Sequence, residues 1–265
     1  MKHYPNRIAW VTGASYGLGR SLAEHMARKG WQVAVSARSE DDLKAFAAES
    51  EGWSGQVHAY PCDITNLDDL KQAVTRIEAE IGPIEIAVLN AGTHQPMRAH
   101  EFDANVFRKL TDINLMGTVN CIEALLPGFY KRQSGQIAVV SSVAGYRGLP
   151  TSAAYGMTKA GLINMAEALK PEFDEANIRI QVVSPGFVRT PLTDKNDFPM
   201  PFIMEPEDAA RAFYKGLVSR RFEIVFPWQM GIIFKLIRML PAPLAFALTK
   251  NMIPDDESGK EEVAS

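Results

Sequence analysis

Residues 7–19 read RIAWVTGASYGLG, and this segment decides the fold. Residues 7–11 form a mostly apolar run that is typical of a buried strand, and an amphipathic helical pattern follows the glycines directly. A strand, a glycine-rich turn and a helix in this order predict a phosphate-binding site, because glycines let the backbone approach an anion and the free N–H groups at the helix start face it. An ordinary tight turn is the alternative for the glycines alone, and the flanking strand and helix count against it.

Six further short apolar runs follow, with longer helical patterns between them. We expect these strands at residues 32–37, 56–60, 84–89, 136–141, 178–183 and 222–226. Short runs that alternate with helices predict the α/β class, with helices on both faces of a parallel sheet. The expected fold is therefore a single-domain, Rossmann-type, doubly wound parallel sheet of about seven strands.

Composition fits one folded unit. The chain has 265 residues, of which 46% are hydrophobic and 22% charged, so it can bury a large core. We expect one domain over residues 1–253 and an acidic, disordered tail over residues 254–265. The net charge of -3 without a basic cluster gives no reason to expect a nucleic-acid partner. Cys62 and Cys121 lack paired spacing and no signal peptide is visible, which favours a reduced, cytoplasmic location. The histidines lack metal-ligand spacing, so no metal is expected.

Tyr155 and Lys159 lie four residues apart, and this spacing would place both on one face of a helix. An ammonium beside the ring favours the phenolate, and bringing a tyrosine pKa from about 10 toward neutrality takes roughly 4 kcal/mol. Ser142, thirteen residues before Tyr155, completes a set that can poise a phenol for proton transfer. The Tyr-x-x-x-Lys spacing is common by chance, so a surface pair that merely shares a helix face is the alternative. Pro171 is expected to bend or end this helix.

Several motifs, in kind, order and spacing, resemble those of the short-chain dehydrogenase/reductases in their compact form. They cover roughly residues 7–225 and comprise Gly13-x-x-x-Gly17-x-Gly19, Asn90-Ala91-Gly92, Asn114, Ser142, Tyr155, Lys159 and Pro185-Gly186-x-Val188-x-Thr190. The resemblance implies an oxidoreductase that transfers hydride between a nicotinamide dinucleotide and a carbonyl group or secondary alcohol. It also implies a homodimer or homotetramer.

The resemblance assigns roles to four residues. Ser142 would donate a hydrogen bond to the substrate oxygen, and Tyr155 would be the general acid for reduction or the base for oxidation. Lys159 would lower the pKa of Tyr155 and hold the nicotinamide ribose, and Asn114 would hold a water that connects Lys159 to solvent. Ser142 could instead bond its own backbone at a strand end, and Asn114 could be an ordinary polar residue inside a helix.

The expected cofactor-binding residues lie in the glycine turn and at the ends of later strands. They are Gly13, Ser15, Gly17, Leu18, Gly19, Arg38, Asp63, Ile64, Asn90, Gly92, Tyr155, Lys159, Pro185, Gly186, Val188 and Thr190. Asp63 looks like the family's adenine-contacting aspartate. Capping of the next helix is its alternative, although Thr65 and Asn66 are closer to that helix.

Arg38 favours NADP(H) over NAD(H). An NAD-binding protein of this fold usually places an acidic residue at the end of the second strand, where this chain has Ser36 and Ala37. The acidic residues 40–42 have a structural account in the first turn of the next helix, with Ser39 as the N-cap. Arg38 is thereby left for a 2′-phosphate, which a guanidinium suits well, and a solvated side chain is the alternative.

Apolar residues after the sixth strand predict a largely apolar substrate pocket. Residues 185–206 should cover the site, and they contain Leu192, Phe198, Met200, Pro201, Phe202, Ile203 and Met204. Such residues serve equally as core or subunit contacts. His94, Gln95 and Met97 either line the mouth of the pocket or are simple loop residues.

Residues 228–240, WQMGIIFKLIRML, are too apolar for an ordinary solvated helix. They are also too short to span a bilayer, which takes about 20 residues, and Pro241 and Pro243 stop them. Lys235 and Arg238 share one face as a narrow basic stripe. We expect a lid or a subunit contact here. The alternative is that residues 228–252 rest on a membrane surface as a peripheral segment. The protein would then be an enzyme that reduces a lipid-like ketone at that surface. A non-catalytic dinucleotide-binding sensor or scaffold is a third reading of the chain.

Overall fold

The computed structural model describes residues 7–191, 193, 200–250 and 252–253. Seven strands form one sheet in the order β3-β2-β1-β4-β5-β6-β7, and every neighbouring pair is parallel. The strands are β1 (Ile8–Thr12), β2 (Gln32–Ser36), β3 (Gln56–Ala59), β4 (Ile86–Leu89), β5 (Gly135–Val140), β6 (Ile178–Pro185) and β7 (Glu223–Phe226). The predicted doubly wound parallel sheet is confirmed, and all seven strands lie at the predicted positions.

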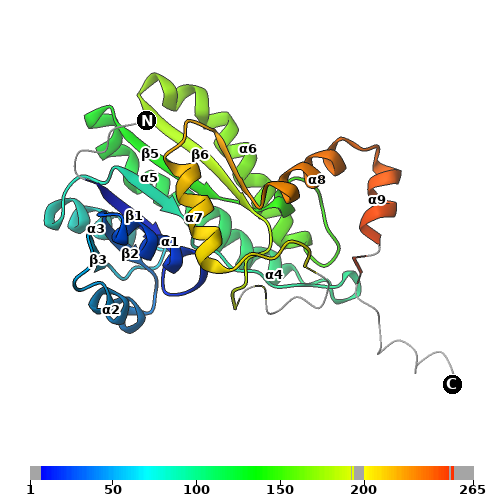
Figure 1. Ribbon diagram of the computed structural model, residues 1–265. Helices are drawn as coiled ribbons and strands as arrows, with labels where there is room; N and C mark the ends of the chain where they lie inside the picture. The colour runs from blue at the N-terminus through cyan, green and yellow to red at the C-terminus, as the bar shows by residue number, and fades with distance from the viewer. Residues whose placement is uncertain (1–6, 192, 194–199, 251, 254–265) are drawn as a thin grey trace.

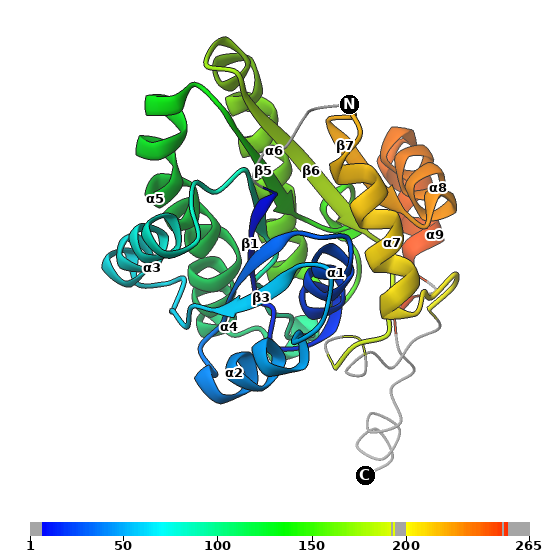
Figure 2. The same ribbon diagram turned by 60° about the vertical axis from the view of Figure 1, so that its left-hand side comes forward.

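Helices cover both faces of this sheet (Figure 1). One face carries α1 (Gly17–Arg28), α2 (Glu40–Glu49) and α7 (Pro206–Leu217), and Figure 2 shows α1 and α7 side by side. The other face carries α3 (Leu67–Glu80), α5 (Gly117–Arg132) and α6 (Ala153–Glu175). The remaining elements are η1 (Ala99–Glu101), α4 (Ala104–Leu110), the π-helical turn η2 (Thr111–Met116), η3 (Val143–Gly145), α8 (Trp228–Met239) and α9 (Ala242–Lys250).

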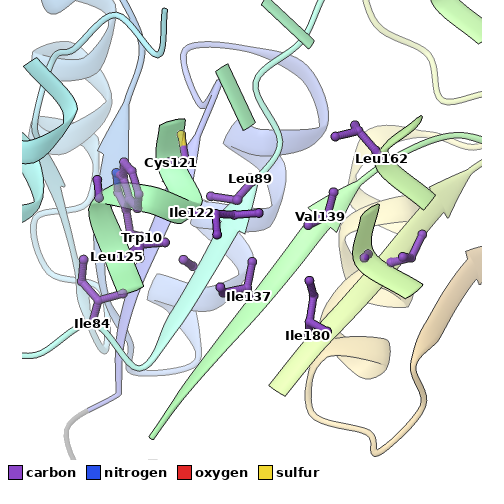
Figure 3. Packing of buried hydrophobic residues seen from close by; sticks show 14 of the residues in the cluster. Trp10, Ile84, Leu89, Cys121, Ile122, Leu125, Ile137, Val139, Leu162 and Ile180 are labelled. Carbon is purple, nitrogen blue, oxygen red and sulfur yellow. The ribbon is translucent and has the colours of Figure 1, made fainter. Parts of the chain in front are cut away.

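The sheet separates two apolar cores because successive side chains of a strand point to opposite faces. Trp10 of β1 lies in the core under α3 and α5, whereas its neighbours Ala9 and Val11 lie in the core under α1 and α7. Figure 3 shows Trp10 close to Leu125 of α5. Burying side chains of this size contributes about 1.5–3 kcal/mol each, so the central strands are fixed in depth and register.

Two local expectations differ from the structure, and the capping alternative for Asp63 is excluded. The helix that carries Tyr155 continues through Pro171 to Glu175, so Pro171 does not end it, and the buried side chain of Phe173 packs the turn beyond the proline onto the core. Ser39 occupies the N-cap position of α2 without a side-chain capping bond. Asn66 caps α3 instead of Asp63, because its side chain accepts from two backbone N–H groups. The domain limits 1–253 stay a prediction, and the tail 254–265 lies outside the described residues.

The order of the strands steps from β1 to β4 in the middle of the sheet. Ligands of doubly wound sheets bind beyond the carboxyl ends of the strands at such a point. A cleft of about 1540 Å³ opens here, and the loops after β1, β2, β3, β4, β5 and β6 line it. The topology therefore places the candidate motifs around one cavity.

Candidate active site

The glycine turn after β1 has a conformation that requires its glycines. Gly13 and Gly17 have φ of 65° and 62°, in the left-handed region. A Cβ on Gly13 would lie 2.6 Å from the Ala91 Cα, and one on Gly19 would lie 2.4 Å from the Gly13 carbonyl oxygen. The backbone of this turn therefore packs closely against the loop that follows β4, with no room for a side chain at Gly13. Helix α1 begins directly at the cleft.

Asn90 and Thr12 hold these two loops together. The Asn90 side-chain amide donates to the backbone carbonyls of Thr12 and Gly13 at 3.1 and 3.0 Å. The Thr12 hydroxyl oxygen accepts from the backbone N–H groups of Asn90 and Ala91, each at 3.1 Å. Sequence reasoning missed this positioning role of Thr12, although a hydroxyl at the end of the first strand was a visible signal.

Nearly all residues expected to bind the cofactor line the cleft. Those on its wall are Gly13, Ser15, Gly17, Leu18, Arg38, Asp63, Ile64, Asn90, Gly92, Tyr155, Lys159, Pro185, Gly186, Val188 and Thr190. Gly19 lies beneath the turn instead, where its missing side chain admits the Gly13 carbonyl. A side-chain-free cradle at a helix N-terminus suits the phosphates of a dinucleotide, so these residues fit the expected cofactor.

Arg38 extends from the end of β2 into the cleft wall as an exposed side chain. In the described part of the chain no carboxylate forms an ion pair with it. The acidic residues 40–42 occupy the first turn of α2 as predicted, and Glu40 pairs with Lys44. Asp63 turns one carboxylate oxygen back to the Thr65 N–H and hydroxyl, at 2.9 and 2.8 Å.

Tyr155 and Ser142 meet across the catalytic end of the cleft. Tyr155 lies near the start of α6 and Ser142 follows β5, and a hydrogen bond joins their side chains. Burial raises the pKa of Tyr155 to about 12, and the bond to Ser142 opposes this rise. Ser142 Oγ also accepts from the Ala144 N–H at 3.1 Å, so the strand-end bond and the tyrosine bond coexist. Ser141, its neighbour, donates instead to the Lys159 carbonyl at 2.8 Å.

Lys159 is buried one helical turn beyond Tyr155. Its Nζ donates to the Val140 carbonyl at 2.9 Å and lies 5.5 Å from the centre of the Tyr155 ring. Burial lowers the pKa of Lys159 to about 8. The expected lowering of the Tyr155 pKa is wrong for the chain by itself, because desolvation of the phenol outweighs the favourable groups around it.

Asn114 is fully buried in the π-helical turn η2 and does not line the cleft. Its side chain donates to the Thr93 carbonyl at 2.9 Å and to Thr158 Oγ1 at 3.2 Å, and it accepts from the Thr93 N–H at 2.7 Å. A Cβ on Gly92 would lie 3.2 Å from Asn114 Oδ1 and 3.5 Å from Lys159 Nζ. Asn114 thus ties η2 to α6 and to the loop after β4, whereas its expected role in holding a water stays a prediction.

The predicted loop 185–206 reaches the cleft through Phe187, whereas the apolar residues named for its wall do not line the cleft. Leu192 and Phe198 lie outside the described residues. Of the described residues named for that wall, Met200, Pro201, Phe202, Ile203 and Met204, none lines the cleft, and Met204 packs in the core beside α7. Leu149, Phe187 and Phe234 line the cleft instead. Phe187 belongs to the predicted loop, whereas long-range packing, which leaves no local sequence signal, brings Leu149 and Phe234 there.

His94 lines the cleft, which decides between its two interpretations. The centre of its ring lies 4.7 Å from that of Tyr155 in an edge-on arrangement. Met97 packs with Val106, Leu110 and Ala154 in a small apolar cluster, and Gln95 accepts from Lys109. Of the three residues in question, only His94 belongs to the site.

The C-terminal apolar helix contributes one described side chain, that of Phe234, to the cleft wall. As predicted, α8 ends before Pro241, and α9 follows it. The buried residues of α8 are Met230, Gly231 and Phe234, and Phe234 reaches the cleft. The role of α8 as a lid, a subunit contact or a membrane contact stays a prediction. None of the described helices combines the length and the apolar character needed to cross a bilayer.

Neither metal ligands nor a disulfide is found in the part of the chain that the structure describes. No group of three or more His, Cys, Asp or Glu side chains gathers there in an arrangement that could hold a metal ion. Cys62 and Cys121 are free and buried, and burial raises the pKa of the Cys62 thiol to about 11.

Comparison with protein families and curated proteins gives one consistent result. A family model described as short chain dehydrogenase matches residues 7–199. An "Uncharacterized oxidoreductase" of Myxococcus xanthus is 36% identical over 246 residues, which cover 93% of this chain and 97% of the relative. The 3-oxoacyl-(acyl-carrier-protein) reductase FabG of Thermotoga maritima is 32% identical over 194 residues, or 71% of this chain and 77% of the relative.

Solved structures show the same fold. A short-chain dehydrogenase from Streptomyces avermitilis superposes with a TM-score of 0.80 at 24% identity, over 94% of this chain and 97% of the other. A short-chain type dehydrogenase/reductase from Mycobacterium marinum gives a TM-score of 0.75 at 28% identity, over 83% and 93% of the two chains. The likeness thus extends over most of the sheet and its helices.

Proposed function

We propose that this protein reduces an apolar carbonyl compound with NADPH. The premise is that the chain belongs to the short-chain dehydrogenase/reductase family and is an NAD(P)-dependent oxidoreductase. The observation that carries this proposal is the meeting of Ser142, Tyr155 and Lys159 at one end of the cleft. A binding module without catalysis would need no such proton donor, so a sensor or scaffold has less in its favour.

In this mechanism the nicotinamide, when bound, supplies the hydride to the carbonyl carbon. The Ser142 hydroxyl donates a hydrogen bond to the carbonyl oxygen, where negative charge develops. The Tyr155 hydroxyl gives its proton to that oxygen, and the product is an alcohol. The tyrosine then regains a proton from solvent, and we propose that a water held by Asn114 carries it past Lys159.

The charges of the site favour this direction. The pKa of Tyr155, about 12, keeps the phenol protonated near neutrality, as a general acid must be. The pKa of Lys159, about 8, keeps the ammonium largely charged at pH 7. At 5.5 Å from the ring, that charge stabilises the phenolate that appears when the proton leaves. Lys159 therefore helps the transition state more than it lowers the resting pKa of the tyrosine.

Arg38 supports NADP(H) as the cofactor. It is an exposed cation on the cleft wall, and no described carboxylate competes for it through an ion pair. Its guanidinium is suited to a 2′-phosphate, and Ser36 and Ala37 provide no acid for ribose hydroxyls. The remainder of the dinucleotide is proposed to be held by the glycine turn and by Asp63, Ile64, Pro185, Gly186, Val188 and Thr190.

An apolar substrate is supported by three apolar side chains on the cleft wall. Leu149, Phe187 and Phe234 line the cleft. The name of the Thermotoga maritima relative is that of a reductase of 3-oxoacyl groups, which supports reduction of a carbonyl on an acyl chain or a similar apolar group. Substrates would be distinguished by how well they fill this wall.

We also propose a homodimer or homotetramer in the cytoplasm. Tyr130 of α5 and Met157 of α6 are exposed large apolar side chains, which supports a contact between subunits through these helices. The free thiols Cys62 and Cys121 suit a reducing compartment. Sedimentation of the purified protein tests the assembly directly.

A panel of ketones and aldehydes of increasing chain length, followed by NADPH absorbance, tests the reaction. We expect turnover with NADPH that improves with apolar substituents and disappears in the Tyr155→Phe variant. Absence of turnover with every member, or equal turnover by the variant, would contradict the proposal.

A further inference from the structure

Helices α8 and α9 carry a large apolar surface that faces away from the protein. Seven of their exposed side chains define it, and we call these residues the outer face: Trp228, Ile232, Leu236, Met239, Leu244, Phe246 and Leu248. The four on α8 are spaced by three or four residues and therefore lie along one side of that helix. The two helices project from the side of the molecule beyond β7 (Figure 1).

This concentration differs from the scattered apolar residues of an ordinary surface. Fifteen large apolar side chains are exposed among the described residues, and nine of them lie between Trp228 and Ile253. Met239 is 81% exposed and Trp228 is 67% exposed. Single exposed apolar residues need no explanation, whereas a gathered patch marks a surface that is covered by something else.

Packing within the chain does not account for the outer face. The buried residues of α8 are Met230, Gly231 and Phe234, and those of α9 are Ala245 and Thr249. The buried residues of α8 thus lie on the side away from its outer residues, and on α9 the outer residues flank the buried pair. The outer residues are available to a partner.

Basic residues accompany the apolar face. Residues 228–250 contain Lys235, Arg238 and Lys250 and no acidic residue, a charge of +3 in a chain whose net charge is -3. Lys235 pairs with Glu223 of β7, so Arg238 and Lys250 remain as exposed cations of the segment. Arg147 adds a cation over the ring of Phe246, at 5.6 Å from its centre.

The charges distinguish between two occupants of this face. A second copy that presented the same face would bring two sets of cations together without a carboxylate from either segment, and like charges oppose such contact. A lipid surface with anionic headgroups offers an apolar layer beneath negative charge, which complements both features. With 12 residues, α8 is about 18 Å long and cannot span a hydrocarbon core of about 30 Å.

We propose that the outer face of α8 and α9 docks on an anionic lipid surface, with both helices lying in the interface. Trp228, Ile232, Leu236 and Met239 enter the apolar layer, and Arg238 and Lys250 contact the headgroups. The acidic residues of 254–265 follow in the sequence and lie outside the described residues, so the full chain is the correct sample. The proposal concerns attachment and does not depend on which cofactor or substrate the cleft takes.

Flotation of the full-length protein with vesicles tests this proposal. We expect binding to vesicles of phosphatidylcholine mixed with phosphatidylglycerol and much weaker binding to phosphatidylcholine alone. Ile232→Glu with Leu236→Glu should abolish binding. Arg238→Gln with Lys250→Gln should weaken it about 30-fold, which corresponds to ~1 kcal/mol for each basic residue near the surface.

Matched variants control for charge and exposure. Phe102→Glu replaces another exposed apolar side chain, and Lys131→Gln with Lys215→Gln removes two exposed charges elsewhere. Both controls should bind like the wild type. Met239→Glu repeats the apolar test at the most exposed position of the face, should the double variant melt at a lower temperature.

Three results would overturn the proposal. The first is no flotation of the wild type with anionic vesicles at low salt. The second is flotation of the glutamate variants equal to that of the wild type. The third is a wild-type oligomer in solution that Met239→Glu dissociates, because a second copy would then cover the outer face.

Discussion

Replacing Arg38 by aspartate should reverse the preference between NADPH and NADH. The substitution removes the proposed partner of the 2′-phosphate and adds a carboxylate that can accept from the ribose hydroxyls. A hydrogen bond between charged groups contributes about 1.5–3 kcal/mol, and the low end applies because Arg38 is exposed. This alone weakens NADPH binding about tenfold.

Repulsion between the new carboxylate and the phosphate adds to this effect. Two negative charges on the phosphate about 5 Å from the carboxylate in water cost ~1 kcal/mol after screening by salt, or about another fivefold. Together with a modest gain for NADH, the ratio of kcat/KM for NADPH to that for NADH should fall on the order of 100-fold.

The assay is the initial rate of substrate reduction with each cofactor under identical conditions. Lys131→Asp is the control, because it makes the same change of charge at an exposed site far along α5. A ratio that stays within twofold of the wild type in Arg38→Asp would refute the proposed phosphate contact. An equal shift in Lys131→Asp would show that net charge, not the contact, sets the preference.

Three further predictions concern the framework of the protein. The urea midpoint of unfolding should be lower for Gly13→Ala than for Gly52→Ala, because both glycines have positive φ but only at Gly13 does a backbone atom lie 2.6 Å from the added Cβ. Equal midpoints for the two variants would contradict the packing argument. Asn66→Ala should cost about 1 kcal/mol in the free energy of unfolding, and Ser39→Ala, which removes no capping bond, should cost almost nothing. Burial lowers the pKa of Lys159 from 10.5 to about 8, so the buried charge destabilises the fold below pH 8 and this penalty fades as the pH rises toward 10.5. Between pH 8 and 10.5 the free energy of unfolding of the wild type should therefore rise by roughly 3 kcal/mol relative to that of Lys159→Met, and a difference that stays constant with pH would refute the shift.

The central strands β1, β4 and β5 could be predicted from the sequence because each is a short, mostly apolar run that is buried on both faces, whereas the edge strands β3 and β7 are only partly buried. Trp10 illustrates this point, since its neighbours are apolar too and the whole of β1 is buried. The glycine turn was equally legible, because Gly13 and Gly17 need a backbone conformation that other residues rarely adopt. Local chemistry therefore fixed the order of the elements and the location of the cleft.

Other parts of the site depend on contacts between distant segments. Phe234 reaches the cleft from α8, and His94 lies against Tyr155, although neither has a local pattern that signals it. The direction of the Tyr155 pKa was mispredicted for the same reason. Spacing indicates that Lys159 shares its helix face, but only the fold reveals how strongly the phenol is desolvated. The helix beyond Pro171 also continues through tertiary packing that propensity alone does not capture.

The central claim is that Tyr155 transfers the proton, and its most direct test is the single-turnover rate of Tyr155→Phe with saturating NADPH and the best substrate of the panel. The substitution removes one hydroxyl and keeps the ring that packs against His94. We predict a loss of at least about 10²-fold in rate, as expected when general acid catalysis is removed, with the Kd of NADPH changed only slightly. A variant that retains more than about a tenth of the wild-type rate would contradict the account.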